Sequence, residues 1–190
     1  MGYRLIALLA ASLVGPAVSA GSTDGAYAPD GRLRAPDHYR EWVFLSSGLD
    51  MNYDIRVGPA GESMFDNVFV DPVSYAAFLK TGTWPDGTLL VKEDRGASKK
   101  GSINRHGKFQ TSSLRGLEVH ARDSARFAGG WAFFFFAAAG AEPAQPIPAS
   151  ASCYSCHKAH GAVDTTFVQF YPTLLPVATD KKTLSSGYHP

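Results

Sequence analysis

Cysteine is scarce in this chain of 190 residues, because only two are present, at Cys153 and Cys156. A disulfide-rich scaffold is therefore excluded, and packing must supply most of the stability. An excess of charge of one sign is also absent, since 18 Lys and Arg residues balance 17 Asp and Glu residues. This balance leaves no electrostatic footprint for nucleic acid or for an anionic membrane surface, and we expect neither partner.

Long apolar runs are equally few. The run from Leu5 to Val18 follows Arg4 and ends in small residues, which is typical of a secretory signal peptide cleaved after Ala20. It is shorter than the about 20 apolar residues that a membrane-spanning helix needs. The run from Gly129 to Ala139 is also short, and its centre is aromatic. We therefore expect an exported protein without a membrane anchor.

The two cysteines stand in the segment Cys153-Tyr154-Ser155-Cys156-His157, a C-x-x-C-H motif. This motif is typical of c-type haem attachment: each thiol adds to one vinyl group, and the histidine binds the iron. A structural disulfide, a thioredoxin-like redox pair and half of a zinc site are the alternatives. Zinc normally needs four ligands, and a redox pair is expected near a βαβ pattern, which we do not find. The sequence predicts one covalent haem c per chain and, with export, a periplasmic location.

The predicted secondary structure is dominated by short strands between glycine-marked turns. This pattern favours a mainly β fold, an antiparallel sheet with a few short helices, over βαβ units. Strands are expected at 42–45, 64–70, 88–93, 108–112, 117–121 and 131–137. One helix is predicted from Pro72 to Gly82, because Asp71 is a good N-cap and proline suits the first helical position. A second helical segment is predicted from Asp164, as its cap, through Phe170.

The mature chain has the length of one domain, which we place at residues 37–176. Residues 21–36 are rich in Gly, Pro and Asp and predict a flexible N-terminal arm, and residues 177–190 are mostly polar and predict a frayed tail. Residues 95–108 are expected to form a solvated loop. The proline-rich stretch 143–148 predicts an extended linker into a haem-bearing loop.

The second axial position of the iron decides the function. An electron-transfer cytochrome fills this position with Met or His. The alternative is a five-coordinate iron over an aromatic pocket, which allows small-molecule chemistry or gas binding. The candidate ligands are Met51, Met64, His38, His106, His120, His160 and His189, and the candidates for an aromatic pocket wall are Phe65, Phe69, Phe109 and Phe133.

A succession of short segments runs in one order through most of the mature chain. It comprises Tyr39-Arg40-Glu41-Trp42-Val43, Val70-Asp71-Pro72 with Tyr75, Asp86-Gly87-Thr88, Val91-Lys92-Glu93, Gly116-Leu117-Glu118, Trp131-Ala132-Phe133, the C-x-x-C-H motif, and Asp164 with the segment from Phe167 to Pro172. Together these segments resemble the cytochrome P-460 family. The resemblance implies a mainly antiparallel β protein, commonly a homodimer, with a five-coordinate c-type haem.

The resemblance also implies a reaction. Hydroxylamine-oxidising members convert hydroxylamine, with nitric oxide as co-substrate, to nitrous oxide, and we expect a cytochrome to accept the electrons. The related cytochrome c-prime beta proteins share the fold and bind nitric oxide and carbon monoxide instead. Ordinary electron transfer is a third alternative.

One lysine is singled out by the resemblance. Lys92 matches the family lysine that, in the hydroxylamine-oxidising members, is covalently attached to the porphyrin edge. Its apolar neighbours at 89–91 predict partial desolvation, which favours a neutral, nucleophilic amine. The alternative is a strand-end lysine that points to water beside Glu93.

Two carboxylates are candidates for the proton acceptor that hydroxylamine oxidation requires. They are Asp66 and Glu118, each with a surface or structural role as the alternative. The arginine that some family members carry in the strand before Asp-Pro has no counterpart here, because that stretch reads Phe65-Asp66-Asn67.

Overall fold

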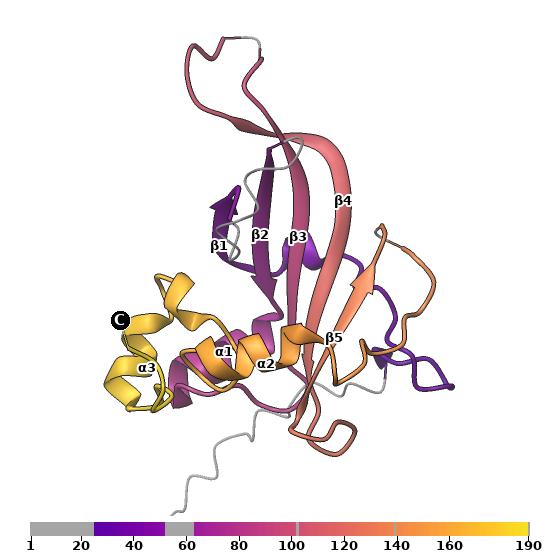
Figure 1. The fold of residues 1–190 in the computed structure, drawn as a ribbon, viewed down its shortest axis with the longest axis vertical. Coiled ribbons are helices and arrows are strands. Elements are labelled where there is room, and N and C mark those ends of the chain that lie inside the picture. Colours follow the sequence, from indigo (N-terminus) through magenta and orange to yellow (C-terminus); the bar gives the residue numbers. More distant parts are fainter. Residues whose placement is uncertain (1–24, 52–62, 102, 139, 190) are drawn as a thin grey trace, which may run out of the picture.

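A computed structural model describes residues 25–51, 63–101, 103–138 and 140–189, so the predicted signal peptide lies outside the described residues. Five antiparallel strands form one sheet in the order β1-β2-β3-β4-β5 (Figure 1), which confirms the predicted fold class. The strands are β1 (Val43–Leu49), β2 (Met64–Val70), β3 (Leu89–Ser98), β4 (Phe109–Arg122) and β5 (Trp131–Phe136). The helices are η2 (Tyr39–Glu41), α1 (Pro72–Thr81), α2 (Ser152–His160), η3 (Val168–Phe170) and α3 (Leu175–Lys181).

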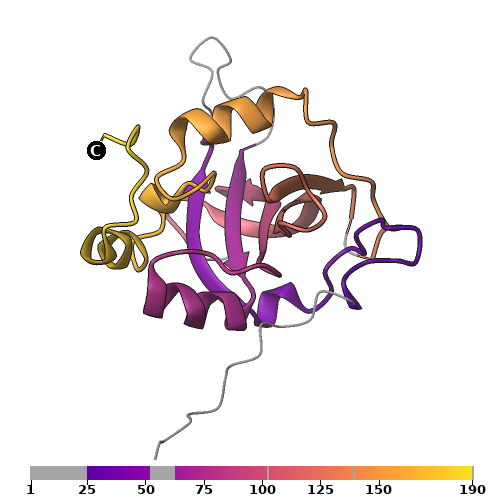
Figure 2. The same ribbon diagram turned by 90° about the horizontal axis from the view of Figure 1, so that it is seen from below.

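The sheet has a hydrophobic core on each of its faces, because successive side chains of a strand point to opposite sides. Val70 and Leu90 belong to one core, together with residues of α1 and α3. Phe69 and Val91, their neighbours in sequence, belong to the other core, with Tyr39 of η2. Seen from below in Figure 2, α2 lies on one side of the sheet and η2 on the other.

Helix α1 forms where its local signals predict. The Asp71 carboxylate accepts a hydrogen bond from the Ser74 amide at 2.8 Å, and Pro72 occupies the first turn. Gly82 ends the helix with φ 75°, a left-handed conformation that glycine adopts without steric cost. Phe78 is fully buried, so the helix packs into the core on the same face of the sheet as Val70.

Glu93 determines which way the middle of β3 faces. Its carboxylate is fully buried and accepts hydrogen bonds from Arg40, Arg95, Tyr39 and Asn67 at 2.5–3.0 Å. This polar cluster lies on the face that also carries Val91, because residues 91 and 93 alternate with residue 92. Lys92 therefore points to the opposite face rather than to water beside Glu93.

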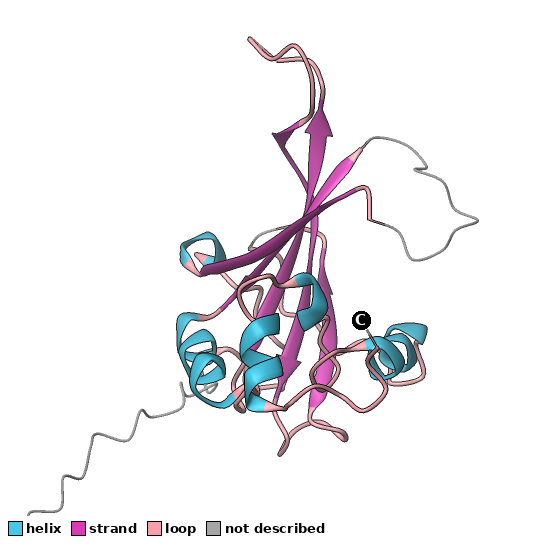
Figure 3. Cartoon of the chain, turned by 90° about the vertical axis from the view of Figure 1, so that its left-hand side faces the viewer, coloured by secondary structure: helices cyan, strands magenta, loops and turns pink. Residues whose placement is uncertain are grey.

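The β3–β4 hairpin is longer than predicted. Strand β3 continues to Ser98, well into the expected loop at 95–108, and the two strands expected at 108–112 and 117–121 are one strand, β4. Figure 3 shows this hairpin projecting from the end of the sheet that lies away from the helices. Pairing of Ala97 with Gln110 and of Ser98 with Phe109 stabilises polar sequence that local propensity assigns to a loop.

Both ends of the domain pack more closely than predicted. In the expected arm, Leu33 is fully buried and pairs with Ala144 in an isolated β-bridge. The expected tail begins inside helix α3 (Leu175–Lys181), and Ala178 of this helix is fully buried. These long-range contacts override a local composition that is poor in large apolar residues.

Two local predictions near the C-x-x-C-H motif were wrong. The motif lies in helix α2, not in a loop. Asp164 caps no helix, because its φ of 53° is left-handed and its side chain pairs with Arg122 at 2.9 Å. The predicted helical segment is reduced to the single turn of η3, which begins after Phe167.

Candidate functional site

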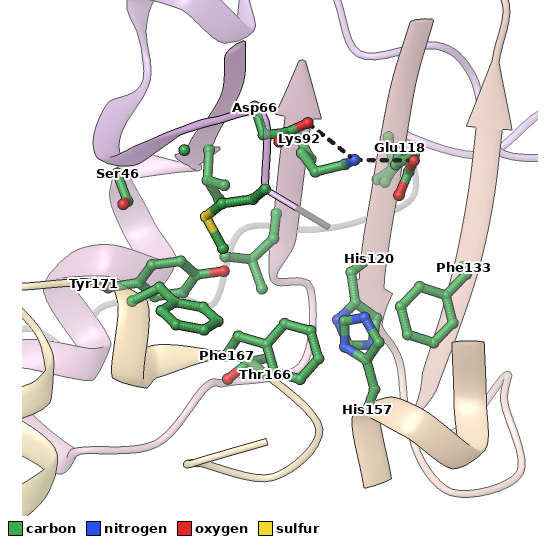
Figure 4. Close-up of a pocket in the computed structure, with 16 residues that line it drawn as sticks. Ser46, Asp66, Lys92, Glu118, His120, Phe133, His157, Thr166, Phe167 and Tyr171 are labelled. Atoms are coloured by element: carbon green, nitrogen blue, oxygen red, sulfur yellow. Dashed lines mark hydrogen bonds and ion pairs between the residues drawn. The ribbon is translucent and has the colours of Figure 1, made fainter. Parts of the chain in front are cut away.

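A cavity of about 890 Å³, including the part that opens to solvent, lies between the sheet and the segments that follow β5. Figure 4 shows a polar side formed by Asp66, Lys92 and Glu118, and a second side formed by aromatic and imidazole rings. The cavity is thus lined by residues of all five strands on one side and by α2 and the segment after it on the other.

Helix α2 presents the C-x-x-C-H motif beside this cavity. Residues three and four apart lie on the same face of an α-helix, so Cys153 is one turn from both Cys156 and His157. Both thiols are free and half-buried. This arrangement brings two nucleophilic sulfurs and an imidazole to one helical face.

Tyr154 fastens α2 to the edge of the sheet. Its hydroxyl donates to the Ile147 carbonyl at 2.9 Å and accepts from the Phe133 amide at 3.3 Å. The Ile147 amide donates to the Phe133 carbonyl, so the proline-rich linker covers the same edge of β5. One side chain inside the motif thereby fixes the distance between helix and sheet.

The ring of His157 is oriented from several directions. Its Nδ1 lies 2.8 Å from the Thr165 carbonyl oxygen, which accepts a hydrogen bond when Nδ1 carries the proton. In that tautomer the other ring nitrogen, Nε2, is available to a metal. Phe167 stacks on the ring at 4.1 Å between centroids, and Phe133 meets its edge at 4.6 Å. Burial lowers the pKa of His157, against the effect of the Thr165 carbonyl. A neutral imidazole is the form that binds metals.

His120 lies against His157, at 5.2 Å between ring centroids. Two imidazoles on opposite faces of one iron, each with a metal–nitrogen distance of roughly 2 Å, have centroids roughly 6 Å or more apart. His120 is therefore not placed to be the second axial ligand. Burial, and to a smaller extent the nearby His157, lowers the pKa of His120 well below its usual value. The His120 ring stacks on Phe133 at 4.0 Å between centroids.

Three carboxylates surround the Lys92 ammonium. Its Nζ lies 3.0 Å from Asp94 Oδ1, 3.1 Å from Glu118 Oε1 and 3.5 Å from Asp66 Oδ1. Register explains the cluster, because Lys92 is opposite Glu118 across β3 and β4, and Asp66 is opposite Asp94 across β2 and β3. Burial alone lowers the pKa of Lys92, but Glu118, Asp94 and Asp66 together raise it above its usual value. The expected neutral amine is thus wrong for this arrangement, in which Lys92 is an ammonium.

Sequence reasoning did not find Asp94. Burial raises the pKa of this carboxyl, Lys92 opposes the shift, and Asp66 adds to it. The sequence signal that could have identified Asp94 is its spacing of two residues from Lys92, which places both side chains on one face of β3. Asp66 and Asp94 are nearly buried, whereas the Glu118 side chain is 51% exposed, so the cluster extends from the interior to solvent.

The other sequence-predicted residues are divided between the cavity and distant surfaces. Of the candidate axial ligands, only Met51 and His120 line the cavity; Met64, His38, His106, His160 and His189 do not. Of the candidate aromatic walls, Phe133 lines it, whereas Phe69 packs on the opposite face and Phe109 is exposed on the hairpin. Phe65 does not line it either. Thr166, Phe167, Phe170 and Tyr171 line the cavity and were missed, since only the chain's return after α2 brings them there.

Comparison with known proteins adds a family to this geometry. A model of the cytochrome P460 family matches residues 36–168, about 70% of the chain, and the match contains the C-x-x-C-H motif, Lys92, Asp94 and Glu118. The chain belongs to the cytochrome P460 family. No curated protein matches the chain.

Membership in the cytochrome P460 family identifies a haem protein, and the side chains that line and flank the cavity suit that cofactor. An imidazole with one nitrogen directed to a carbonyl, two thiols on the same helix and flanking aromatic rings form a donor set suited to haem. In the part of the chain that the structure describes, no helix is long and apolar enough to cross a membrane.

Proposed function

We propose that this cytochrome P460 family member is a periplasmic c-type haem enzyme that oxidises hydroxylamine, with nitric oxide as co-substrate, to nitrous oxide. The observation that carries the proposal is the placement of Asp66 and Glu118 in the cavity that His157 also lines. Haem proteins that only carry electrons have no need of such carboxylates beside the iron. A reaction that releases protons needs such carboxylates to accept them.

Cys153 and Cys156 would hold the haem through thioether bonds, and His157 would bind its iron through Nε2. When bound, the haem supplies a redox-active iron that binds the nitrogen substrates and accepts electrons from them. Joining one hydroxylamine to one nitric oxide gives nitrous oxide and water and releases one proton and one electron. The electron leaves to a soluble acceptor, for which we propose another cytochrome.

The proton is the part of the reaction that the chain's own residues handle. Glu118 reaches both the cavity and solvent, and its carboxylate pairs with Lys92. It is therefore suited to accept a proton from the substrate and release it outside. Asp66 is the deeper acceptor, because its side chain is only 12% exposed and its carboxylate lies 3.5 Å from Lys92 Nζ. The aromatic side, with Phe133 and Phe167, limits the access of water.

Gas binding of the c-prime beta kind is the second candidate, and Lys92 is the observation that favours it. Attachment to the porphyrin edge requires a neutral amine, whereas the three carboxylates hold Lys92 as an ammonium. A protein without this cross-link would retain an open iron position and an aromatic pocket, which suffice to bind nitric oxide or carbon monoxide.

Mass spectrometry of tryptic peptides separates the two candidates. Trypsin releases residues 127–158 with the haem attached, and it cleaves after Lys92 only when that amine is unmodified. In the enzyme, peptide 127–158 and haem travel joined to residues 81–95, and hydroxylamine is consumed in steady state. The matched control K92R removes the link and preserves the charge.

Peptide 127–158 with haem alone, together with tight nitric oxide binding and no hydroxylamine turnover, would establish the gas-binding protein.

The thioether attachment is tested by unfolding the protein in denaturant. We expect haem to dissociate from C153A/C156A but not from the wild type. A low-spin, six-coordinate spectrum would contradict both candidates and favour electron transfer, with Met51 as the remaining cavity-lining ligand. Export and assembly into a homodimer stay proposals, tested by fractionation and by sedimentation.

A further inference from the structure

A tight turn at residues 163–166 faces His157. The Thr166 amide donates to the Val163 carbonyl at 2.9 Å, and the Thr166 hydroxyl donates to the same carbonyl at 2.8 Å. Asp164, inside the turn, has a left-handed φ of 53°. Thr165 is the residue of this turn whose carbonyl lies 2.8 Å from His157 Nδ1.

The main body of the protein holds three consecutive residues of the turn. The Trp84 indole donates to the Thr166 hydroxyl at 2.9 Å, and Arg122 donates to the Asp164 carboxylate at 2.9 Å. Thr165 is held by His120, whose Nε2 lies 3.3 Å from its hydroxyl oxygen. His120 and Arg122 are two residues apart on β4 and therefore point to the same face.

Gly161 allows the turn to press against the end of α2. A Cβ at this position would lie 2.8 Å from the Thr165 carbonyl carbon and 2.9 Å from the Thr166 amide nitrogen. Both atoms belong to the backbone, so neither could move aside without displacing the turn. The residue between helix and turn is thus glycine because the backbones approach closely, not because of its φ, which is −67°.

We propose that His120 is a positioning residue, which acts through Thr165 to set the hydrogen bond that His157 donates, and so the strength of the bond between His157 and the haem iron. This inference rests on the proposed function, because it takes His157 as the iron ligand. His120 contacts the ligand ring edge-on and Thr165 at its hydroxyl. Stacking on Phe133 and contact with Trp131 at 4.3 Å hold His120 itself in place.

The physical effect follows from the second shell of metal sites. A carbonyl that accepts a hydrogen bond from the outer nitrogen of a ligating histidine fixes the ring and makes it a stronger electron donor. A stronger donor stabilises the ferric state and lowers the reduction potential of the iron. Loss of the contact between His120 and Thr165 frees the turn on one side and weakens the hydrogen bond between His157 Nδ1 and the Thr165 carbonyl.

The test uses the holoprotein and a matched pair of variants. T165V removes the hydroxyl and keeps the carbonyl, whereas T165S keeps both; H120F removes the imidazole and retains the ring stacking. Resonance Raman spectra of the ferrous protein measure the iron–histidine stretch, and spectroelectrochemistry measures the midpoint potential. We expect T165V and H120F to lower the stretching frequency and raise the potential, and T165S to match the wild type.

Unchanged frequency and potential in T165V, with only a lower unfolding temperature, would mean that His120 and Thr165 are merely structural and would overturn the inference. T165V keeps the test decisive if H120F does not fold. Failure of the proposed function gives a different result: the wild type would then show no iron–histidine stretch, or would show the stretch without turnover of hydroxylamine.

Discussion

At the scale of single residues, Glu93 carries the largest stability prediction. Its fully buried carboxylate pairs with Arg40 and Arg95 and accepts from Tyr39 and Asn67. E93Q leaves two guanidinium groups without their counter-charge, and we expect a loss of about 3 kcal/mol in the free energy of unfolding. Urea denaturation at neutral pH measures the loss. E41Q, on the exposed surface of η2, is the matched control and should change the stability by less than about 0.5 kcal/mol.

Glu93 also predicts a pH dependence. Burial by itself raises its pKa, but Arg95, Arg40, Tyr39 and Asn67 together hold it well below the usual value. A group with a lowered folded pKa contributes stability that is present above its unfolded pKa and is lost as the pH falls toward the folded value. We therefore expect the wild type to lose stability as the pH falls below about 4.3, the pKa of a glutamate in an unfolded chain. E93Q should show a shallower loss over this range, and parallel curves for the two proteins would contradict the assignment.

The two cavity carboxylates predict a kinetic effect. If Glu118 and Asp66 accept the substrate proton, E118Q and D66N should each lower hydroxylamine turnover by about 100-fold or more, the usual contribution of a general base. Nitric oxide affinity should change little, because binding releases no proton. Turnover within a few-fold of the wild type in both variants would assign the cluster a structural role around Lys92.

At the scale of elements, the placement of α2 depends on Tyr154. No residue of this helix is fully buried, so its attachment to β5 rests on few contacts, of which the Tyr154 hydroxyl bridge to Phe133 and Ile147 is one. Y154F keeps the ring contact with Phe133 and removes the bridge. We expect a loss of about 1 kcal/mol in stability and a fall in the yield of haem-loaded protein, measured from the absorbance ratio of haem to protein. An unchanged ratio would show that haem attachment does not need the bridge.

At the scale of the whole molecule, the two faces of the sheet have different tasks. The face that carries Val91 and Phe134 is closed by its own core, whereas the face that carries Lys92 and His120 borders the cavity. Haem bound there contributes its binding free energy to the folded state. We expect C153A/C156A, purified without haem, to unfold at a midpoint lower by roughly 10 °C, equivalent to about 3 kcal/mol. Equal midpoints with and without haem would mean that the first face alone determines stability.

Some features of this protein can be read from local sequence. Asp71, Pro72 and Gly82 predict α1 correctly, because a cap, a fixed φ and a left-handed glycine act within a few residues. The C-x-x-C-H spacing places two thiols and an imidazole on one turn, whichever structure carries it. Even so, the motif's own backbone was misjudged, since α2 is stabilised by Tyr154 and the edge of β5 rather than by helical propensity.

The sequence by itself determined the haem motif, the antiparallel strand pattern and helix α1, because each depends on the chemistry of neighbouring residues. The tertiary structure alone decided that Asp66, Asp94 and Glu118 meet at Lys92, since strand register brings together side chains from three strands. It also decided that His120 stands beside His157, at 5.2 Å between ring centroids. Register and the return of the chain after α2 are long-range properties, set by the burial of both sheet faces at once, and no local pattern encodes them.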